Sequence, residues 1–569
     1  MLPLWIVSAL SYATRAVSSA AGQHDPLVRT KNGTLRGLSL PAFGEELFLG
    51  VPFAEPPLGN LRLRHPVPYR SAWDGVRDAT SRSVSCAGYA GFDQGLALGE
   101  DCLTVDIVRP AGAAAGDGLP VLVWIYGGGF TAGGSADPRY NTSYLVNASV
   151  EMGKPIIAVS LNYRVGGWGF LASRETVSAG ASNIGLFDQR LALEWIHENI
   201  AAFGGDPSRV TIAGESAGAF SVGYHLVSRD GKSGGLFRAA ILQSGTALGP
   251  ALHSVADLDD TYQPIYDNVT RAVGCAGRDD SLQCLRDVPY EVLFRAFEPF
   301  VLTPIVDGDF LARLPSESFA RGLVADVAIL AGSNTDEGTA TFFGPRGTLN
   351  RDADVRRLLA GMGSGLDDAA VRDLMRLYPD NPSLGCPFGT GPERFAENGR
   401  QYKRGAAIVG DEVIHAGRRW TTTYFATRHL GPGGRRRKPV YSYRFDQPPW
   451  DGVEPLVATT APVFATHYAE ICFVFAIDPA ASRNLSNWIG PYPAYHQLAR
   501  QMSRAWIAFV HDLDPNGHGT EGMPRWPEYS SCGAGENMVF RVDGNFVEKD
   551  DWRAAPLRYW GGIWEALKT

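Results

Sequence analysis

The stretch Val210-Thr-Ile-Ala-Gly-Glu-Ser-Ala-Gly218 decides the fold of this 569-residue chain. Its first half is a short apolar run typical of a buried strand. Its second half fits the pattern G-x-S-x-G, and a helical pattern through Phe220, Val222 and Leu226 follows. A strand, a sharp turn and a helix in this order are the context of a nucleophilic serine. The glycines relieve crowding, and we expect Ser216 to be strained and exposed above a sheet.

Other short apolar runs predict a mainly parallel sheet around this strand. Helical patterns separate the runs, for example over residues 188–200, and such alternation indicates an α/β fold. The segments 250–320 and 345–435 break the alternation, so we expect them to be insertions into one sheet. The predicted strands cover residues 121–126, 156–161, 239–242, 327–331 and 440–445.

Length and composition exclude several classes of protein. Hydrophobic residues make up 45% and charged residues 20%, as in globular rather than disordered proteins. The net charge of −8 argues against a nucleic-acid partner. The length alone suggests about four domains, but no linker divides the chain. We therefore predict a signal peptide over residues 1–20 and a single domain over residues 21–569.

The N-terminus and the sequons favour export. An apolar run from Leu2 to Leu10 is followed by small residues, as in a signal peptide, and it is too short to span a bilayer. No later run approaches the ~18 apolar residues that a membrane span needs. We predict a secreted glycoprotein. The candidate glycosylation sites are Asn32, Asn141, Asn147, Asn268 and Asn484.

A glycine run offers donors for a developing negative charge. Gly127, Gly128 and Gly129 directly follow the predicted strand 121–126, and glycine lets backbone N–H groups approach an oxyanion closely. The N–H of Ala217 would complete such a hole. A dinucleotide-binding loop is the alternative interpretation, but the run leads to Pro138 rather than into a helix.

A serine nucleophile also needs a base and an acid, which in this fold follow it in the order acid, then histidine. Asp336 and Glu337 follow the predicted strand 327–331, and both fit from chemistry alone. His467 stands out among the later histidines because it ends a loop and precedes an apolar run that begins at Glu470. The histidines beyond the acid are His415, His429, His467, His496, His511 and His518.

Metal and cofactor sites are not indicated. No cysteine or histidine cluster has zinc spacing. Residues 512–517 begin like a calcium loop, but Pro515 disrupts the pattern and Met523 stands where a glutamate belongs, so we predict a turn. Cys472 lies in an apolar run, which favours a buried inert thiol over a second nucleophile. We predict no metal and no cofactor.

Several blocks in order resemble the type-B carboxylesterase/lipase family, which includes cholinesterases and fungal lipases. They span nearly the whole mature chain, which makes them far more specific than the pentapeptide. The blocks are Phe48-Leu-Gly-Val-Pro-Phe-Ala-Glu-Pro-Pro57, Glu100-Asp-Cys-Leu103, Tyr126-Gly-Gly-Gly-Phe130, Asn162-Tyr-Arg-Val165, residues 183–190, Phe203-Gly-Gly-Asp-Pro207, residues 214–218 and Asp336-Glu-Gly338.

The resemblance implies an α/β-hydrolase fold, with a large, mostly parallel sheet flanked by helices and carrying long helical and loop insertions. It implies a catalytic triad of Ser216, Glu337 and His467, and so chooses between the two acids. Gly128, Gly129 and Ala217 match the oxyanion donors, and Glu215, Ser244 and Glu470 match supporting residues around the triad.

The resemblance also implies structural cross-links. It pairs Cys86 with Cys102 and Cys275 with Cys284, and it leaves the pairing of Cys386, Cys472 and Cys532 open. It further implies two ion pairs, Arg62 with Glu100 and Arg164 with Asp188.

Two departures from the family bear on the substrate. Tyr468 follows the histidine where many relatives have glycine, so a ring would shape the pocket. Only 15 residues separate Cys86 from Cys102, where fungal lipases carry a much longer lid. The short loop favours an open pocket for small-molecule esters.

We predict a secreted serine carboxylic-ester hydrolase that acts through an acyl-enzyme on short-to-medium-chain esters. One alternative is a true lipase or sterol esterase on long-chain lipid esters. An alternative of another class is a non-catalytic, cholinesterase-like binding or adhesion module. The oligomeric state stays open.

Overall fold

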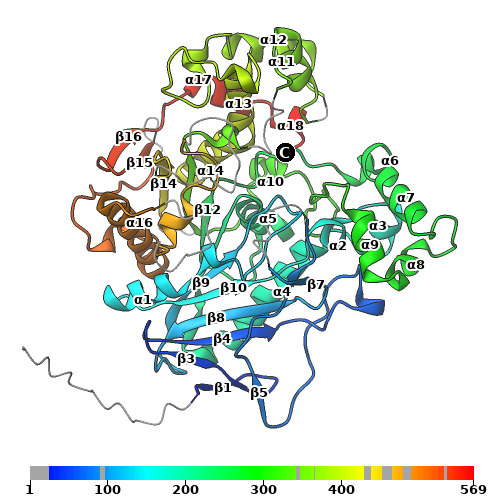
Figure 1. Cartoon of the computed structure of the whole chain (residues 1–569), viewed down its shortest axis with the longest axis vertical. Helices are drawn as coiled ribbons and strands as arrows, with labels where there is room; N and C mark the ends of the chain where they lie inside the picture. The colour runs from blue at the N-terminus through cyan, green and yellow to red at the C-terminus, as the bar shows by residue number, and fades with distance from the viewer. Residues whose placement is uncertain are drawn as a thin grey trace, which may run out of the picture.

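The computed structural model describes residues 25–89, 96–340, 347–363, 365–428, 438–450, 464–478, 489–530 and 535–569. The predicted signal peptide, Asn484 and Cys532 lie outside the described residues. An 11-stranded sheet runs through the molecule (Figure 1). Its spatial order is β16 (Phe546–Lys549), β15 (Glu536–Phe540), β14 (Val440–Phe445), β13 (Ala328–Asn334), β12 (Ala239–Gln243), β11 (Gly205–Glu215), β9 (Leu119–Ile125), β10 (Ile157–Leu161), β8 (Thr104–Pro110), β4 (Glu45–Pro52) and β3 (Leu38–Leu40).

The middle of this sheet is parallel, from β10 through β15, and its outer strands are antiparallel. The predicted α/β-hydrolase fold is confirmed. The chain forms β10 after β9, yet β9 lies between β10 and β11. This exchange brings β9 beside β11, with Ile125 paired to Gly214. The glycine run and Ser216 therefore leave the sheet at neighbouring points.

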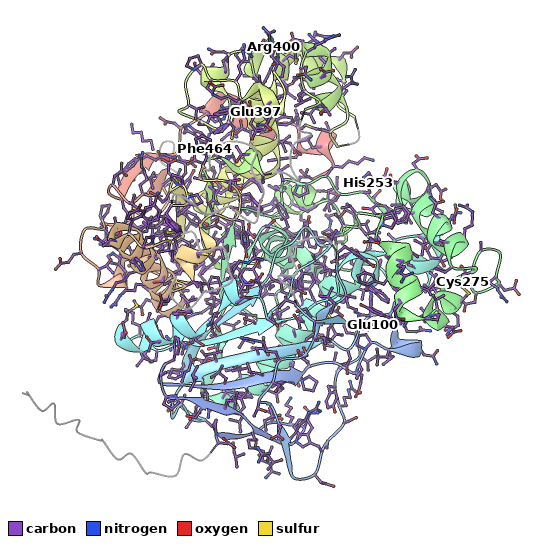
Figure 2. All side chains as sticks on the ribbon, viewed as in Figure 1. Glu100, His253, Cys275, Glu397, Arg400 and Phe464 are labelled. Carbon is purple, nitrogen blue, oxygen red and sulfur yellow. A yellow bond between two sulfur atoms is a disulfide. The ribbon has the colours of Figure 1, made fainter. Side chains whose placement is uncertain are left out.

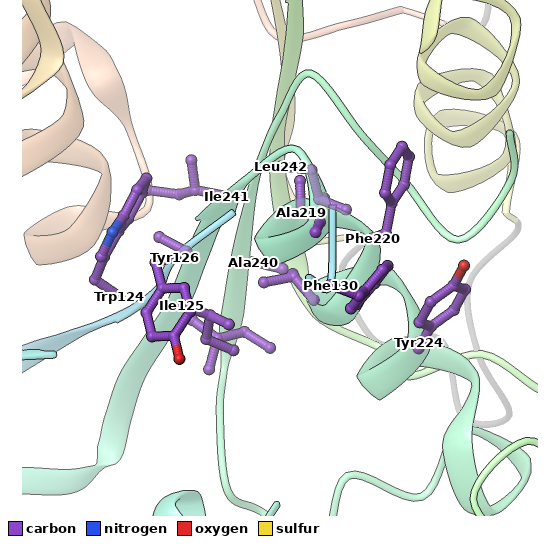
Figure 3. Packing of buried hydrophobic residues seen from close by; sticks show 14 of the residues in the cluster. Trp124, Ile125, Tyr126, Phe130, Ala219, Phe220, Tyr224, Ala240, Ile241 and Leu242 are labelled. Carbon is purple, nitrogen blue, oxygen red and sulfur yellow. The ribbon is translucent and has the colours of Figure 1, made fainter. Parts of the chain in front are cut away.

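Helices cover both faces of the sheet. In Figure 1, α1 (Ser143–Glu151) and α16 (Pro493–Asp512) lie on one side, and α4 (Ile184–Asn199) and α5 (Ala217–Gly231) lie on the other. Side chains alternate between the two faces along a strand. Figure 3 shows Trp124 and Ile241 on one side and Ala240 and Leu242 on the side of α5. All four side chains are buried.

The two predicted insertions leave the sheet at different places. Residues 250–320 follow β12 and form α6 (Leu258–Thr261), α7 (Gln263–Ala272), α8 (Ser281–Asp287), α9 (Tyr290–Phe297) and α10 (Pro315–Ala320). The second insertion follows β13 and forms α11 (Asp352–Ala360), α12 (Asp368–Leu377), α13 (Tyr402–Gly410) and α14 (Ala416–Thr427). Figure 1 shows α6–α9 at the right and α11–α13 at the top.

The implied cross-links are present in the structure. Disulfides join Cys86 to Cys102 and Cys275 to Cys284, the second of them at the outer end of the α6–α9 insertion (Figure 2). Both implied ion pairs are also present, Arg62 with Glu100 and Arg164 with Asp188. In each pair, the Nε and Nη2 groups of the arginine donate to the two oxygens of the partner carboxylate.

The sequons within the described residues differ in exposure. Asn268 is exposed on α7, whereas the amide nitrogen of Asn32 donates inward to the carbonyl of Tyr69, and that of Asn147 donates to the carbonyl of Phe43. Asn141 is half-buried and accepts a hydrogen bond from the Ser143 N–H. Within the described ranges, no helix has the length and apolar character needed to cross a bilayer.

The buried pair Arg164–Asp188 gives a test of the fold. In an Asp188→Leu variant the guanidinium stays buried without its partner, so we expect the free energy of unfolding to fall by about 3–5 kcal/mol. Urea unfolding measures this loss. The same substitution at Asp259, which pairs with Arg174 at the exposed surface, should cost less than about 1 kcal/mol. Equal losses at the two sites would contradict the assignment.

Candidate active site

The candidate residues meet at the carboxyl edge of the parallel strands. Gly127 to Gly129 follow β9, Ser216 follows β11, and Glu337 follows β13 in a short turn, Glu337–Thr339. His467 lies beyond β14, in a segment that packs beside the Glu337 turn. Neighbouring parallel strands end at the same edge of a sheet, so residues more than 300 positions apart in sequence come together.

Ser216 occupies a strained turn between β11 and α5. Its φ of 56° and ψ of −125° lie outside the regions that non-glycine residues favour. Its N–H donates to the carbonyl of Gln243 over 3.0 Å. A Cβ atom on Gly218 would lie 2.0 Å from the carbonyl oxygen of Ile125, so only glycine fits there. The glycines of the pentapeptide thus allow the close approach that the turn requires.

Our expectation of an exposed Ser216 is wrong, since the residue is only 7% exposed. The glycine loop after β9 and the His467 segment cover the turn, so that Ser216 faces a cavity. This cavity has a volume of about 280 Å³. Its lining includes Gly127, Gly128, Gly129, Glu215, Ser216, His467 and Tyr468.

His467 links the serine to the acid. Its Nε2 lies 2.8 Å from the Ser216 Oγ, and its Nδ1 lies 2.5 Å from the Glu337 Oε2. The other carboxylate oxygen of Glu337 accepts the N–H of Asn334 over 2.7 Å. With the ring proton on Nδ1, Nε2 can accept the hydroxyl proton of Ser216. The arrangement therefore suits proton transfer from serine to histidine.

Asp336, the other acid candidate, points away from His467. One of its oxygens accepts the N–H of Phe388 over 2.8 Å and faces the Cys386 thiol. The backbone of Asp336 instead joins the loop that carries Glu337 to the loop that carries His467, because the Asp336 N–H donates to the carbonyl of Ala465 over 2.9 Å. Of the two adjacent carboxyls, only that of Glu337 contacts the imidazole.

Further hydrogen bonds join the acid and histidine segments. The side-chain amide of Asn334 donates to the carbonyl of Thr466 over 2.8 Å and to Glu470 over 2.7 Å. The Thr339 hydroxyl donates to the Thr466 hydroxyl. Thr466, the residue before His467, is thus hydrogen-bonded to a residue on each side of Glu337 in sequence, Asn334 and Thr339. These bonds set the position of the imidazole.

Of the three predicted supporting residues, two carry carboxyls beside the triad. Glu215 Oε1 lies 3.1 Å from His467 Nε2. Burial, together with the charges of Glu470 and Glu337, raises the pKa of Glu215 well above its usual range, and Arg139 opposes the shift. Glu470 accepts the side-chain amide of Gln243 over 3.2 Å.

The third supporting residue contributes differently. The hydroxyl of Ser244 has no hydrogen-bond partner among the described residues, and its N–H donates to the carbonyl of Gly332 over 2.9 Å. Ser244 therefore touches the site only through the backbone turn after β12.

The predicted oxyanion donors lie beside Ser216. Gly128 and Gly129 have positive φ values, 113° and 64°, and both line the cavity. Within the described part of the chain, neither N–H donates to another backbone group. Ala217 begins α5, where N–H groups lack partners inside the helix. Three N–H groups are thus available around the serine.

Asp137 and Arg139, which were not among the predicted site residues, form a buried ion pair in the wall of the same cavity. A signal was present, because two opposite charges stand only a few residues after the glycine run. Asn334 and Gln243, whose amides donate to Glu470, were not predicted either, because isolated amides in strands carry no sequence pattern that would reveal this role.

This sheet, with serine, histidine and glutamate at its carboxyl edge, defines the esterase and lipase class of α/β-hydrolases. The model of the Carboxylesterase family matches residues 24–560, and the chain belongs to this family. Lipase 4 of Diutina rugosa is 36% identical, over 93% of this chain and 94% of that protein. Secreted lipase 1 of Botryotinia fuckeliana is 35% identical, over 90% of this chain and 89% of that protein. The crystal structure of Aspergillus niger EstA covers 96% of this chain and 99% of its own, with a TM-score of 0.80 at 25% identity.

The environment of Asp336 predicts a pH dependence of stability. Burial raises the pKa of its carboxyl from 3.8 to about 7, although the Phe388 N–H opposes the shift. The folded chain therefore holds this proton more tightly than the unfolded chain does. The stabilisation is complete below pH ~4 and is lost as the pH rises towards ~7.

We expect an Asp336→Asn variant to keep its stability over this range, so that its melting temperature falls less than that of the wild type between pH 4 and pH 7. Thermal unfolding at steps of one pH unit measures the difference. The exposed Asp326 provides the control, because Asp326→Asn should follow the wild-type curve. Parallel curves for Asp336→Asn and wild type would contradict the prediction.

Proposed function

We propose that the protein is a secreted serine carboxylic-ester hydrolase that works through an acyl-enzyme. The observation that carries this proposal is the position of His467, which lies within hydrogen-bond distance of both Ser216 and Glu337. A hydroxyl, an imidazole and a carboxylate in this order are the groups that acyl transfer needs.

The proposed reaction begins when Ser216 Oγ attacks the acyl carbon of the ester. His467 Nε2 accepts the hydroxyl proton, and Glu337 stabilises the imidazolium that forms. The N–H groups of Gly128, Gly129 and Ala217 stabilise the oxyanion of the tetrahedral intermediate. His467 then gives its proton to the leaving alcohol. Water, activated by the same imidazole, finally releases the acid from Ser216.

Export is part of the proposal. The apolar N-terminal segment, the sequons and the disulfides support it, because disulfides persist in oxidising compartments. A relative that carries the name secreted lipase supports it as well. Asn268 is the best-exposed candidate for glycosylation among the described sequons.

The proposed substrates are short-to-medium-chain esters. A cavity of about 280 Å³ and the short Cys86–Cys102 loop support this choice. The names of the relatives favour a second candidate, a lipase that acts on long-chain lipid esters.

Substitutions in the triad test the mechanism. Ser216→Ala should abolish the hydrolysis of p-nitrophenyl butyrate, because no nucleophile remains. Glu337→Gln should lower kcat by about 10⁴-fold, since an amide in place of the carboxylate no longer holds the imidazole in the tautomer that accepts the serine proton. Asp336→Asn is the matched control beside it and should retain activity. Loss of activity in Asp336→Asn with activity kept in Glu337→Gln would contradict the assigned acid.

A fluorophosphonate probe separates an enzyme from a non-catalytic module. The wild type should react at Ser216 and Ser216→Ala should not, as seen by mass spectrometry of the labelled peptide. An unlabelled wild type with intact fold would refute the proposed nucleophile.

A series of p-nitrophenyl esters from acetate to palmitate tests the substrate class. We expect kcat/KM to be highest for acyl groups of about four to eight carbons, because longer chains exceed the cavity. Tributyrin below and above its solubility limit extends the test. A steep rise in rate on emulsions, with preference for long chains, would favour the lipase.

A further inference from the structure

A buried ion pair in the wall of the cavity has no role in the proposed reaction. Asp137 and Arg139 flank Pro138 in a short turn between the glycine loop and α1. Each residue is only 3% exposed, yet both line the cavity that holds Ser216. Burying two charges is expensive, and apolar residues of similar size often serve stability equally well. Stability alone therefore does not explain this pair.

The guanidinium of Arg139 has one unused donor group. Its Nε lies 2.9 and 3.0 Å from the two carboxylate oxygens of Asp137, and its Nη2 also donates to this carboxylate. The remaining amino group, Nη1, has no hydrogen-bond partner among the residues that the structure describes. Arg139 lines the cavity, and Nη1 is not among the fully buried polar atoms, so this amino group is accessible from the cavity. A ligand in the cavity can supply the missing acceptor.

The charge balance favours a neutral acceptor. The Asp137 carboxylate lies on Arg139 and compensates its positive charge. Glu215, the neighbouring carboxyl in the cavity, would repel an anion whenever it is ionised. An ether or hydroxyl oxygen accepts a hydrogen bond without bringing further charge into the cavity.

The position of Arg139 indicates which part of the ester it meets. The leaving oxygen must lie near His467 Nε2, because it takes its proton from there. Tyr468 follows His467 directly, and the centre of its ring lies 4.9 Å from the Cζ of Arg139. Arg139 therefore belongs to the side of the cavity that faces the leaving alcohol.

We propose that Arg139 determines specificity for the alcohol part of the ester, by donating a hydrogen bond from Nη1 to an ether or hydroxyl oxygen there. The preferred substrates are then esters of oxygen-bearing alcohols, such as glycol or polyol esters. This inference rests on the proposed function, since it assigns a substrate class to the same site.

Two nearly isosteric esters test the inference, 2-methoxyethyl butyrate and n-butyl butyrate. They share the acyl group, and one CH₂ group of the alcohol is replaced by oxygen. The measured quantity is the ratio of their kcat/KM values, compared between wild type and variants so that intrinsic reactivity cancels. A hydrogen bond from a charged donor is worth about tenfold or more in this ratio.

The main variant is Asp137→Leu with Arg139→Met, which removes both charges together and leaves neither one unpaired. We expect the ratio to fall about tenfold, while hydrolysis of n-butyl butyrate persists. A second variant, Arg139→Lys, keeps the positive charge but removes Nη1, and should lower the ratio similarly. The matched control makes the same changes at the exposed pair Asp259 and Arg174, and its ratio should equal that of the wild type.

An unchanged ratio in both Arg139 variants would overturn the inference. So would a larger effect on an ether oxygen in the acyl chain, measured with butyl 3-methoxypropanoate against butyl pentanoate. Failure of the proposed function has a different signature, because wild type would then hydrolyse neither butyrate ester and would not react with the fluorophosphonate. Hydrolysis of both esters with an unaltered ratio refutes the role of Arg139 alone.

Discussion

The site depends on one geometric constraint: the imidazole of His467 must lie within hydrogen-bond distance of two groups from different strands. Its contacts to Ser216 and Glu337 measure 2.8 and 2.5 Å. A shift of 1 Å would break either contact. Three features of the fold keep these two distances short. They are the placement of β9 beside β11, the strained turn at Ser216 and the hydrogen bonds from Asn334.

Electrostatics adds a second constraint at the same place. Glu215, Glu337 and Glu470 are all buried beside His467. Like charges this close disfavour simultaneous ionisation. Burial raises the pKa of Glu215 and of Glu470, so each of these two carboxyls holds its proton more tightly than it would in water. The amides of Asn334 and Gln243 satisfy Glu470, which keeps this crowded carboxyl in place.

Local pattern was enough to predict the strand, turn and helix around Ser216, because all three lie within some twenty consecutive residues. It could not choose between Asp336 and Glu337, which are adjacent and chemically alike. The choice depends on which carboxyl faces His467, and this orientation is set by contacts across 130 positions. The family resemblance pointed to Glu337, and this is the carboxyl that contacts the imidazole. Neither the local pattern nor the family resemblance predicted the burial of Ser216, since this burial depends on segments that pack over the turn from elsewhere in the chain.

Tyr468 connects His467 to the charged wall of the cavity. Its φ of 77° lies in the left-handed region, which glycine adopts freely and a tyrosine adopts only with strain. Such strain persists where surrounding contacts hold the residue in place. The Tyr468 ring packs edge-on against Tyr140 at 6.2 Å and lies against the Arg139 guanidinium. A glycine at this position would offer neither contact. The departure from glycine and the buried Asp137–Arg139 pair are therefore parts of one arrangement, in which the strained backbone after His467 places a ring against the charged wall of the cavity.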